Sequence, residues 1–302
     1  MIKNLNDLLV AAKKQKTMKL VIAAAQDQDV LNAVSKAYEE GVIDPILVGS
    51  KTKIEEIALK DNLDISKFRI IDEEDMEQAA KISVKLVFDG EADFIMKGLL
   101  DTAILLKAVL DKEIGLRTDS QLSHVMVYEV PSYHKLLFLT DGGMNIAPSF
   151  EEKVKITKNV VAVAKALGNT NVKIAALAAK EKVNPKMPAT VDADKLQTLS
   201  RAGEFGEGVT LEGPLAFDLA VSKDAAEVKG FSSEIAGDVD VLLVPTIEVG
   251  NGIGKTLAYL AGAEGAGVIM GAKVPVVLVS RADSYEAKLY SIALASVVAA
   301  CK

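Results

Sequence analysis

The fold class of this chain is clearest in residues 239–261, which read VDVLLVPTIEVGNGIGKTLAYLA. The apolar run 239–244 predicts a buried strand, residues 244–256 predict a glycine-rich turn, and residues 257–261 predict a helix. Glycines let backbone N–H groups approach an oxyanion, and the N-terminus of a helix adds partial positive charge. The stretch therefore predicts an α/β fold with an anion site at a strand end, and it places Lys255 at the start of the helix.

The end of this stretch is similar to a nucleotide-binding P-loop, but its spacing differs. The P-loop motif needs a glycine five residues before Gly254, and Val249 occupies that position. The predicted ligand is therefore a phosphate or another small anion rather than ATP.

Composition narrows the class of protein further. Half of the 302 residues are hydrophobic, while aromatic residues are scarce and tryptophan is absent. Such a composition suits parallel strands that are buried on both faces between helices. The net charge of −7 and the lack of a basic cluster argue against nucleic-acid binding. The single cysteine, Cys301, excludes an internal disulfide and a cysteine zinc site.

The sequence predicts a soluble, cytoplasmic protein. Residues 1–15 are charged and amphipathic and lack the apolar centre of a signal peptide. The longest apolar stretch, 290–301, is shorter than the roughly 20 residues that a membrane-spanning helix needs.

Apolar runs and helical patterns alternate along most of the chain, which predicts parallel strands joined by right-handed crossovers. Predicted strands cover 18–24, 45–49, 68–71, 94–96, 173–178, 239–244 and 274–279, and predicted helices cover 29–40, 52–60, 75–88, 101–110, 151–167, 194–202 and 284–298. One hairpin is expected, with strands 123–130 and 136–140 around a turn at 131–134.

This pattern predicts the α/β class, with two α/β/α domains of mostly parallel sheets and an interdomain cleft. The first, discontinuous domain is expected to contain residues 1–117 and 272–302, and the second to contain residues 118–271.

The strongest candidate for chemistry is the segment that follows the predicted strand 274–279, because ligands of open α/β sheets bind outside the carboxyl ends of strands. Here Arg281 can clamp a phosphate bidentately and Ser280 can donate a hydrogen bond. Asp283 and Glu286 lie within the next turn, and either can act as a general base. An equally plausible alternative is that Ser280 and Asp283 only cap the last helix while Arg281 is solvated.

A second anion-capable helix start contains Asp101 and Thr102, with Lys107 further along the helix and Lys97 before it. Capping alone is the more common role for such residues. Asp141, which two glycines follow, is expected to form a turn at the end of the hairpin.

The sequence lacks the motifs that are typical of several classes of enzyme. No Gly-x-Ser-x-Gly elbow surrounds Ser280, and neither His124 nor His134 lies near a candidate nucleophile in sequence. No HExxH or Cys/His spacing predicts a transition metal. The first strand lacks a following Gly-x-Gly-x-x-Gly turn, which argues against a Rossmann-type dehydrogenase.

Taken together, these segments resemble the phosphate acetyltransferase/phosphate butyryltransferase family, in its phosphate butyryltransferase branch. The resemblance covers most of the chain in order and is densest in segments 212–218, 244–255, 260–264 and 280–281, with further agreement in 97–107 and 140–143.

The resemblance implies a fold similar to isocitrate and isopropylmalate dehydrogenases, with the active site in the cleft. It implies reversible acyl transfer between coenzyme A and orthophosphate, with both as substrates and with no bound cofactor or metal. By position, Arg281 is expected to bind phosphate, and Ser280 to hydrogen-bond the thiol or the developing oxyanion. Lys255 and Asn251, together with Thr102 and Lys107, are expected to form further phosphate contacts. The resemblance also implies a homo-oligomer.

One residue departs from the family pattern. The acetyltransferases place an aspartate, the proposed base, seven residues after the serine, and Ala287 occupies that position here. Asp283, which is slightly favoured, and Glu286 are the available substitutes.

Two other functions remain as alternatives to a short-chain acyltransferase. A decarboxylating dehydrogenase would want an aspartate cluster and several arginines, and the chain has only four arginines. A non-catalytic sensor would bind acyl-CoA or acyl phosphate without turnover.

Overall fold

The computed structural model describes residues 1–279 and 283–301. Contacts along the chain separate it into two compact units. The N-terminal unit comprises Leu5–Ser120 with Ala266–Lys302, and the central unit comprises Met1–Asn4 with Gln121–Gly265. Both units combine helices with mostly parallel strands, which confirms the predicted α/β class.

In the N-terminal unit the strands lie in the order β3-β2-β1-β4-β11-β10. All neighbours are parallel except β10 and β11, which pair antiparallel. The elements are α1 (Leu5–Lys14), β1 (Met18–Ala23), α2 (Gln28–Glu39), β2 (Ile43–Gly49), α3 (Lys51–Asp61), β3 (Arg69–Asp72), α4 (Met76–Phe88), β4 (Phe94–Lys97), α5 (Thr102–Val109), β10 (Glu264–Met270), β11 (Val276–Val277) and α11 (Tyr285–Ala300).

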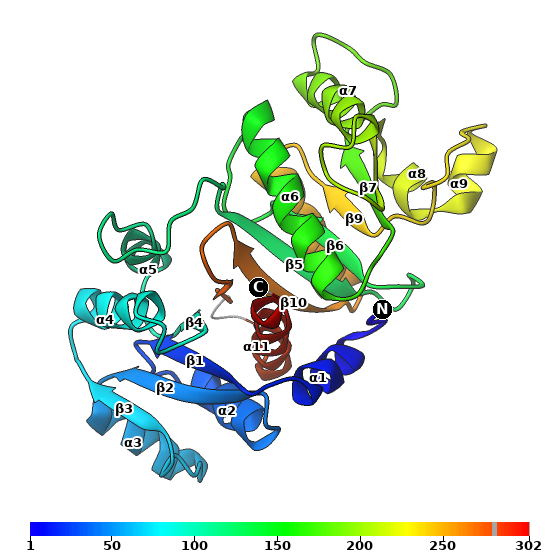
Figure 1. The fold of residues 1–302 in the computed structure, drawn as a ribbon. Coiled ribbons are helices and arrows are strands. Elements are labelled where there is room, and N and C mark those ends of the chain that lie inside the picture. The colour runs from blue at the N-terminus through cyan, green and yellow to red at the C-terminus, as the bar shows by residue number, and fades with distance from the viewer. Residues whose placement is uncertain (280–282, 302) are drawn as a thin grey trace. The chain divides into compact units, whose positions relative to one another are not determined.

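Helices cover both faces of this sheet (Figure 1). α4 packs on β1, β2 and β4, whereas α2 packs on β2 and contacts α11, which also contacts α1. From β1 to β3 the chain adds strands on one side of β1, and it then crosses back to add β4 on the other side. Because the crossovers are right-handed, this change of side places α4 on the opposite face of the sheet from α2. Most of α11 is buried, so its alanine-rich sequence forms core.

In the central unit the strands lie in the order β5-β6-β9-β7-β8. The predicted hairpin is confirmed: β5 and β6 pair antiparallel, while the other neighbours are parallel. The elements are β5 (Ser123–Glu129), β6 (Leu137–Thr140), α6 (Phe150–Ala166), β7 (Val172–Leu177), α7 (Pro188–Arg201), β8 (Val209–Leu215), α8 (Phe217–Val221), α9 (Lys223–Val228), β9 (Val241–Leu243) and α10 (Ile247–Leu260).

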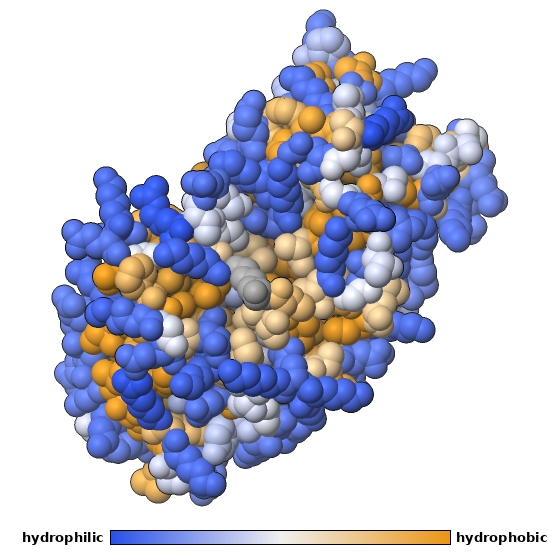
Figure 2. Space-filling model, in the orientation of Figure 1, coloured by the Kyte–Doolittle hydropathy of each residue, from blue (hydrophilic) through white to orange (hydrophobic). Residues whose placement is uncertain are grey.

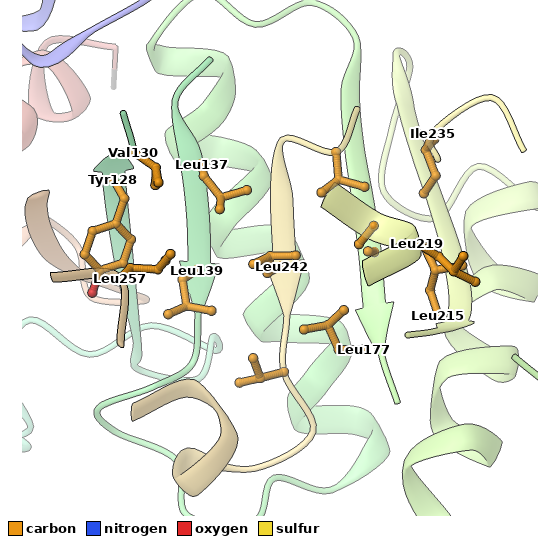
Figure 3. Packing of buried hydrophobic residues seen from close by; sticks show 14 of the residues in the cluster. Tyr128, Val130, Leu137, Leu139, Leu177, Leu215, Leu219, Ile235, Leu242 and Leu257 are labelled. Carbon is orange, nitrogen blue, oxygen red and sulfur yellow. The ribbon is translucent and has the colours of Figure 1, made fainter. Parts of the chain in front are cut away.

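One face of the central sheet packs against α8, α9 and α10 (Figure 3). Alternate strand residues such as Leu137 and Leu139 point to this face, as the two-residue period of a strand requires. They meet Leu219 of α8 and Leu257 of α10. Aliphatic side chains therefore form most of the interior, as the composition predicts.

Four elements of the central unit differ from the sequence-based prediction. β8 was not predicted, because its sequence VTLEGPL is interrupted by polar and turn-forming residues. The short helices α8 and α9 were not predicted either. α7 begins at Pro188, several residues before the predicted 194, and the proline occupies the first helical turn, where its missing N–H is harmless.

In the N-terminal unit, the strand β10 was not predicted, and β11 is shorter than the predicted strand 274–279. Hydrophilic side chains cover most of the face that Figure 2 shows, with apolar patches between them. No helix among the described residues is long and apolar enough to cross a membrane.

Candidate active site

The glycine-rich segment after β9 is helical, so the prediction of a glycine turn there is wrong. α10 starts at Ile247 rather than near Leu257, and its N-cap residue Thr246 makes no side-chain capping bond. Three glycines lie inside the helix, although each glycine costs about 1 kcal/mol relative to alanine there. Lys255 consequently lies in the third turn of α10 and not at its N-terminus.

Close packing explains two of these glycines. A side-chain carbon at Gly250 would lie 2.6 Å from the Cα atom of Gly142, and one at Gly254 would lie 2.7 Å from the Oη atom of Tyr128. Gly250 therefore lets α10 approach the loop that follows β6. The glycines serve helix packing, and tertiary contacts outweigh the local preference for a turn.

Asn251 and Lys255 lie on the exposed side of α10. They are four residues apart, so they are neighbours on the helix surface. The Nζ atom of Lys255 lies 5.6 Å from the ring centroid of Tyr259, one further turn along. The structure thus brings these two candidate phosphate ligands to one face of the helix.

The loop after β6 is held by Asp141, whose side chain is buried. Its Oδ1 atom accepts hydrogen bonds from the N–H groups of Gly143, at 2.8 Å, and Met144, at 2.9 Å. Its Oδ2 atom accepts one from the Asn145 amide at 2.5 Å. These bonds confirm a turn at Asp141. Because β6 and β9 are parallel neighbours, this loop and the start of α10 leave the same edge of the sheet.

In the N-terminal unit, β4 leads into α5. Asp101 is the N-cap residue of α5, and Thr102 is the first helical residue and is half-buried. The first N–H groups of a helix and its dipole attract anions, so Thr102 lies where an anion-binding residue was predicted.

Lys107 lies in the last turn of α5 rather than at its N-terminus. Its side chain is 76% exposed, and its Nζ atom lies 3.9 Å from a carboxylate oxygen of Glu77 on α4. The structure therefore does not place the ammonium group of Lys107 beside the backbone of Thr102.

Lys97, at the end of β4, is buried, whereas the sequence indicates only that it precedes the helix start. Its ammonium group donates to the carbonyl oxygens of Gly98 and Leu100, both at 3.1 Å. The N–H groups of Gly98 and Leu99 also bond to the carbonyls of Ala23 and Ala24. These contacts fix the loop that precedes Thr102. The signal for Lys97 in the sequence is a lysine that directly follows three apolar strand residues.

The remaining candidates follow β11. Ser280 and Arg281 lie outside the described residues. Asp283 is half-buried and immediately precedes Ser284, the N-cap residue of α11, whereas Glu286 is exposed in the first turn of that helix. β11 is the parallel neighbour of β4, so the chain leaves both strands at the same edge of the sheet. This edge therefore brings the surroundings of Asp283 and of Thr102 to one side of the N-terminal unit.

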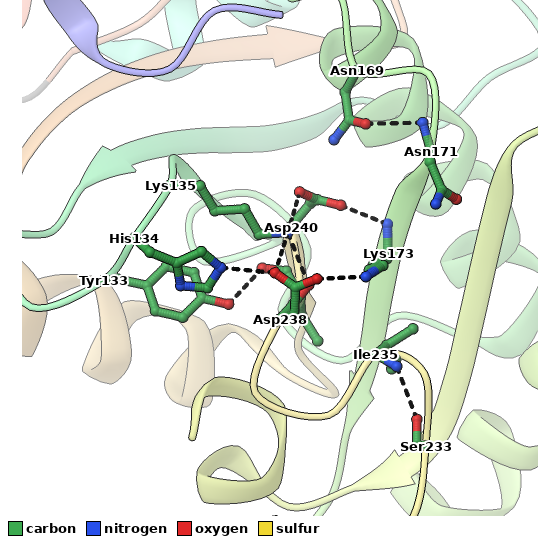
Figure 4. Close-up of polar contacts among 11 residues, drawn as sticks. Tyr133, His134, Lys135, Asn169, Asn171, Lys173, Ser233, Ile235, Asp238 and Asp240 are labelled. Carbon is green, nitrogen blue, oxygen red and sulfur yellow. Dashed lines mark hydrogen bonds and ion pairs between the residues drawn. The ribbon is translucent and has the colours of Figure 1, made fainter. Parts of the chain in front are cut away.

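In the central unit, a cluster of charged and polar side chains lies at the amino ends of β7 and β9, whereas the candidate site residues follow the carboxyl ends of strands (Figure 4). Asp238 pairs there with Lys173, Lys135 and His134. Burial alone would raise the pKa of Asp238, but hydrogen bonds from these three side chains outweigh burial and hold the pKa well below its usual range. Burial next to Asp238 and Asp240 raises the pKa of the Tyr133 hydroxyl, which donates to the Val239 carbonyl at 2.8 Å. This cluster joins the hairpin turn to two strands.

Comparison with known proteins adds a decisive observation. The model of the phosphate acetyl/butaryl transferase family matches residues 4–84 and 73–296. The chain belongs to the phosphate acetyl/butaryl transferase family. This result confirms the resemblance that the sequence segments carry.

Relatives in this family match the chain over nearly its full length. A phosphate butyryltransferase of Clostridium acetobutylicum is 46% identical over all of this chain and all of its own length. A phosphate acetyltransferase of Thermotoga maritima is 42% identical and is matched over 96% of this chain and 98% of its own length.

Solved structures of phosphate acetyl/butaryl transferase relatives agree with the fold. A branched-chain phosphotransacylase from Enterococcus faecalis V583 superposes with a TM-score of 0.83 at 35% identity, over 94% of this chain and 99% of the other. A phosphotransacetylase from Streptococcus pyogenes also gives a TM-score of 0.83, at 22% identity over 99% of this chain and 98% of the other, which supports the fold alone.

Among residues 1–279 and 283–301, no group of three or more histidine, cysteine or carboxylate side chains is placed to hold a metal ion.

Proposed function

We propose that this protein is a phosphate butyryltransferase, which reversibly converts butyryl-CoA and orthophosphate to butyryl phosphate and coenzyme A. The observation that carries the proposal is the 46% identity to the Clostridium acetobutylicum phosphate butyryltransferase over the whole of both chains. A phosphate acetyltransferase, or a short-chain phosphate acyltransferase of broader specificity, is the second candidate, because an acetyltransferase relative is 42% identical.

The proposed reaction is direct transfer. The sulfur of the coenzyme A thiolate attacks the carbonyl carbon of the acyl phosphate and forms the S–C bond, while the C–O bond to phosphate breaks and orthophosphate leaves. The proton of the thiol passes to a base. A base is needed because a thiol with a pKa of about 8.5 is mostly protonated at neutral pH.

The proposal gives each candidate residue a role. Arg281 binds the transferred or leaving phosphate, and Ser280 hydrogen-bonds the thiol or the oxyanion. Asp283 or Glu286 accepts the proton. Thr102 contributes a helix N-terminus, which the described geometry of α5 supports.

Asn251 and Lys255 form further phosphate contacts in the proposal from the exposed face of α10. The sequence predicted that Lys255 would lie at a helix start. In the proposal it contributes instead the positive charge of its side chain, from the third turn of α10. Lys107 has the weakest support, because its exposed ammonium group lies 3.9 Å from a carboxylate oxygen of Glu77.

A thiol-release assay tests the function. With butyryl-CoA, addition of orthophosphate should release free coenzyme A, and the rate should depend on phosphate concentration. No release with any acyl-CoA would refute the enzyme and leave a non-catalytic sensor. Initial rates with acetyl-, propionyl- and butyryl-CoA would then separate the two enzyme candidates, since one methylene in a pocket changes specificity by about 1–3 kcal/mol.

The Arg281→Lys variant tests the phosphate site. Lysine keeps the charge but loses the two-pronged geometry, so the KM for phosphate should rise while the KM for acyl-CoA stays the same. An equal rise in both KM values would argue against a specific phosphate contact.

The proposal also includes a cytoplasmic location, which the sequence predicts, and a homo-oligomeric state, which the family resemblance alone implies. Light scattering coupled to gel filtration would test the oligomer, and a monomer at micromolar concentration would contradict it.

A further inference from the structure

α11 contains a buried lysine, Lys288, that packing does not explain. Lys288 is the fourth residue of the helix and is 2% exposed. Burial of an ammonium group is costly, and the N-terminal turn of a helix also disfavours a cation. Its neighbours on the helix, Leu289 and Ile292, are buried apolar residues, so an apolar side chain would suit this position equally well. Lys288 therefore needs a role other than core packing.

The contacts of Lys288 show what its charge holds. Its Nζ atom donates a 2.6 Å hydrogen bond to the backbone carbonyl of Asp283. The same atom lies 3.6 Å from a carboxylate oxygen of Asp29, in the first turn of α2. The Asp29 side chain is 59% exposed, so this ion pair is weak and the bond to the Asp283 carbonyl is the stronger contact.

Backbone bonds strengthen the same link. The N–H group of Lys288 donates to the carbonyl of Ser284 at 3.1 Å, and the Ser284 hydroxyl accepts from the N–H group of Ala287 at 3.2 Å. Ser284 is held as the N-cap residue by these bonds, but they do not reach Asp283 itself. The side chain of Lys288 extends the hold by one residue and fixes the peptide of Asp283 against α11.

We propose that Lys288 is a positioning residue that places Asp283 as the base of the acyl transfer. The inference rests on the proposed function, in which Asp283 or Glu286 accepts the thiol proton, and it selects Asp283. Glu286 is exposed in the first helical turn, whereas Asp283 is half-buried and its backbone is tethered. A base must hold its position to within a fraction of an ångström, because a misplacement of about 1 Å can cost about a hundredfold in rate.

A double-mutant cycle on kcat tests the inference, with Lys288→Met and Asp283→Asn measured singly and together in the thiol-release assay. Methionine keeps the buried stem but removes the charge. Each single variant should lower kcat by about tenfold or more and leave the KM values for phosphate and acyl-CoA nearly unchanged. In the Asp283→Asn background, Lys288→Met should have no further effect, since the group that Lys288 positions no longer acts.

Lys153→Met is the matched control. Lys153 is also a buried lysine, and its Nζ atom pairs with Asp192 at 2.6 Å in the central unit. Any effect of this substitution on kcat should add to that of Asp283→Asn, because the ammonium group of Lys153 is paired with Asp192. Asp29→Asn removes only the weak ion pair and should leave kcat close to that of the unaltered protein.

Three results would overturn the inference: an unchanged kcat in Lys288→Met, a mild loss in Asp283→Asn, or additive losses in the double variant. If Lys288→Met does not fold, Lys288→Arg replaces it in the same cycle, because arginine keeps the charge but presents a wider donor group. Failure of the proposed function has a different signature, since the unaltered protein itself would then release no thiol.

Discussion

Replacement of single glycines in α10 by alanine tests whether these residues serve packing or an anion. Gly250 and Gly252 lie two residues apart in the same helix, so they share the same gain in helix propensity, about 1 kcal/mol for alanine. Their surroundings differ. A side-chain carbon at Gly252 meets nothing within 4 Å, whereas one at Gly250 lies 2.6 Å from Gly142 Cα and 2.9 Å from the Asp141 carbonyl oxygen.

The expected effects have opposite signs. Gly252→Ala should raise the free energy of unfolding by about 1 kcal/mol. Gly250→Ala meets backbone atoms that cannot rotate away, so an overpacking cost of about 3 kcal/mol is expected, and the propensity gain reduces the net loss to about 2 kcal/mol. For a unit of this size, these values correspond to a rise in Tm of about 2–4 °C and a fall of about 4–8 °C.

Thermal and urea unfolding, followed by circular dichroism at matched protein concentration, would measure both variants. The KM for phosphate should be unchanged in Gly252→Ala. Equal changes in stability for the two variants would refute the packing argument. A stabilised Gly252→Ala protein with a greatly raised KM for phosphate would instead indicate that this glycine contributes to phosphate binding.

Three further predictions concern other parts of the molecule. At the start of α6, the Ser149 hydroxyl and the Glu152 carboxylate each accept a backbone N–H and form a capping box. Ser149→Ala removes this capping box and should lower the free energy of unfolding by about 1 kcal/mol, whereas Ser149→Asp should not lower it. The pKa of Asp238 is lowered from 3.8 in the folded state, so the contribution of its carboxylate to stability is present above that value and is lost as the pH falls below it. In urea unfolding, Asp238→Asn should therefore lower the free energy of unfolding more at pH 7 than at pH 3. An equal loss at both pH values would contradict the ion-pair account. Lys107→Ala should change the free energy of unfolding by less than about 0.5 kcal/mol, because the side chain is exposed, and it should raise the KM for phosphate less than Arg281→Ala does.

The repeating strands and helices were predictable because each carries its own local pattern. The buried strand Met18–Ala23 and the helix Met76–Phe88 with its Asp75 cap illustrate this, since apolar runs and capping residues report burial and helix starts directly. β8 escaped prediction because its sequence carries no such run. Its place in the sheet depends on pairing with β7, which is a long-range contact.

Candidate site residues were identified in sequence by their position after predicted strands and by family resemblance. The structure shows Thr102 at a helix start, and it shows Asp283 immediately before the Ser284 cap. Neither the sequence pattern nor the resemblance indicated that Lys288 bonds to the Asp283 carbonyl. The bond forms because the side chain of Lys288 is buried in the fold, and the place of this lysine within an apolar helix does not indicate that burial.

By itself, the sequence determined the α/β class, the antiparallel hairpin and membership of an acyltransferase family. Hydrophobic periodicity, turn residues and the order of segments are properties of the sequence itself and need no knowledge of distant contacts. Only the tertiary structure decided the role of the glycines in residues 244–256. Local chemistry favours a turn there, but the segment is helical, and the close approach of Gly250 to Gly142 and of Gly254 to Tyr128 explains why glycine occupies these two helical positions. Packing against distant residues outweighs the local propensity of about 1 kcal/mol per glycine, and this energy cannot be read from neighbouring residues in the sequence.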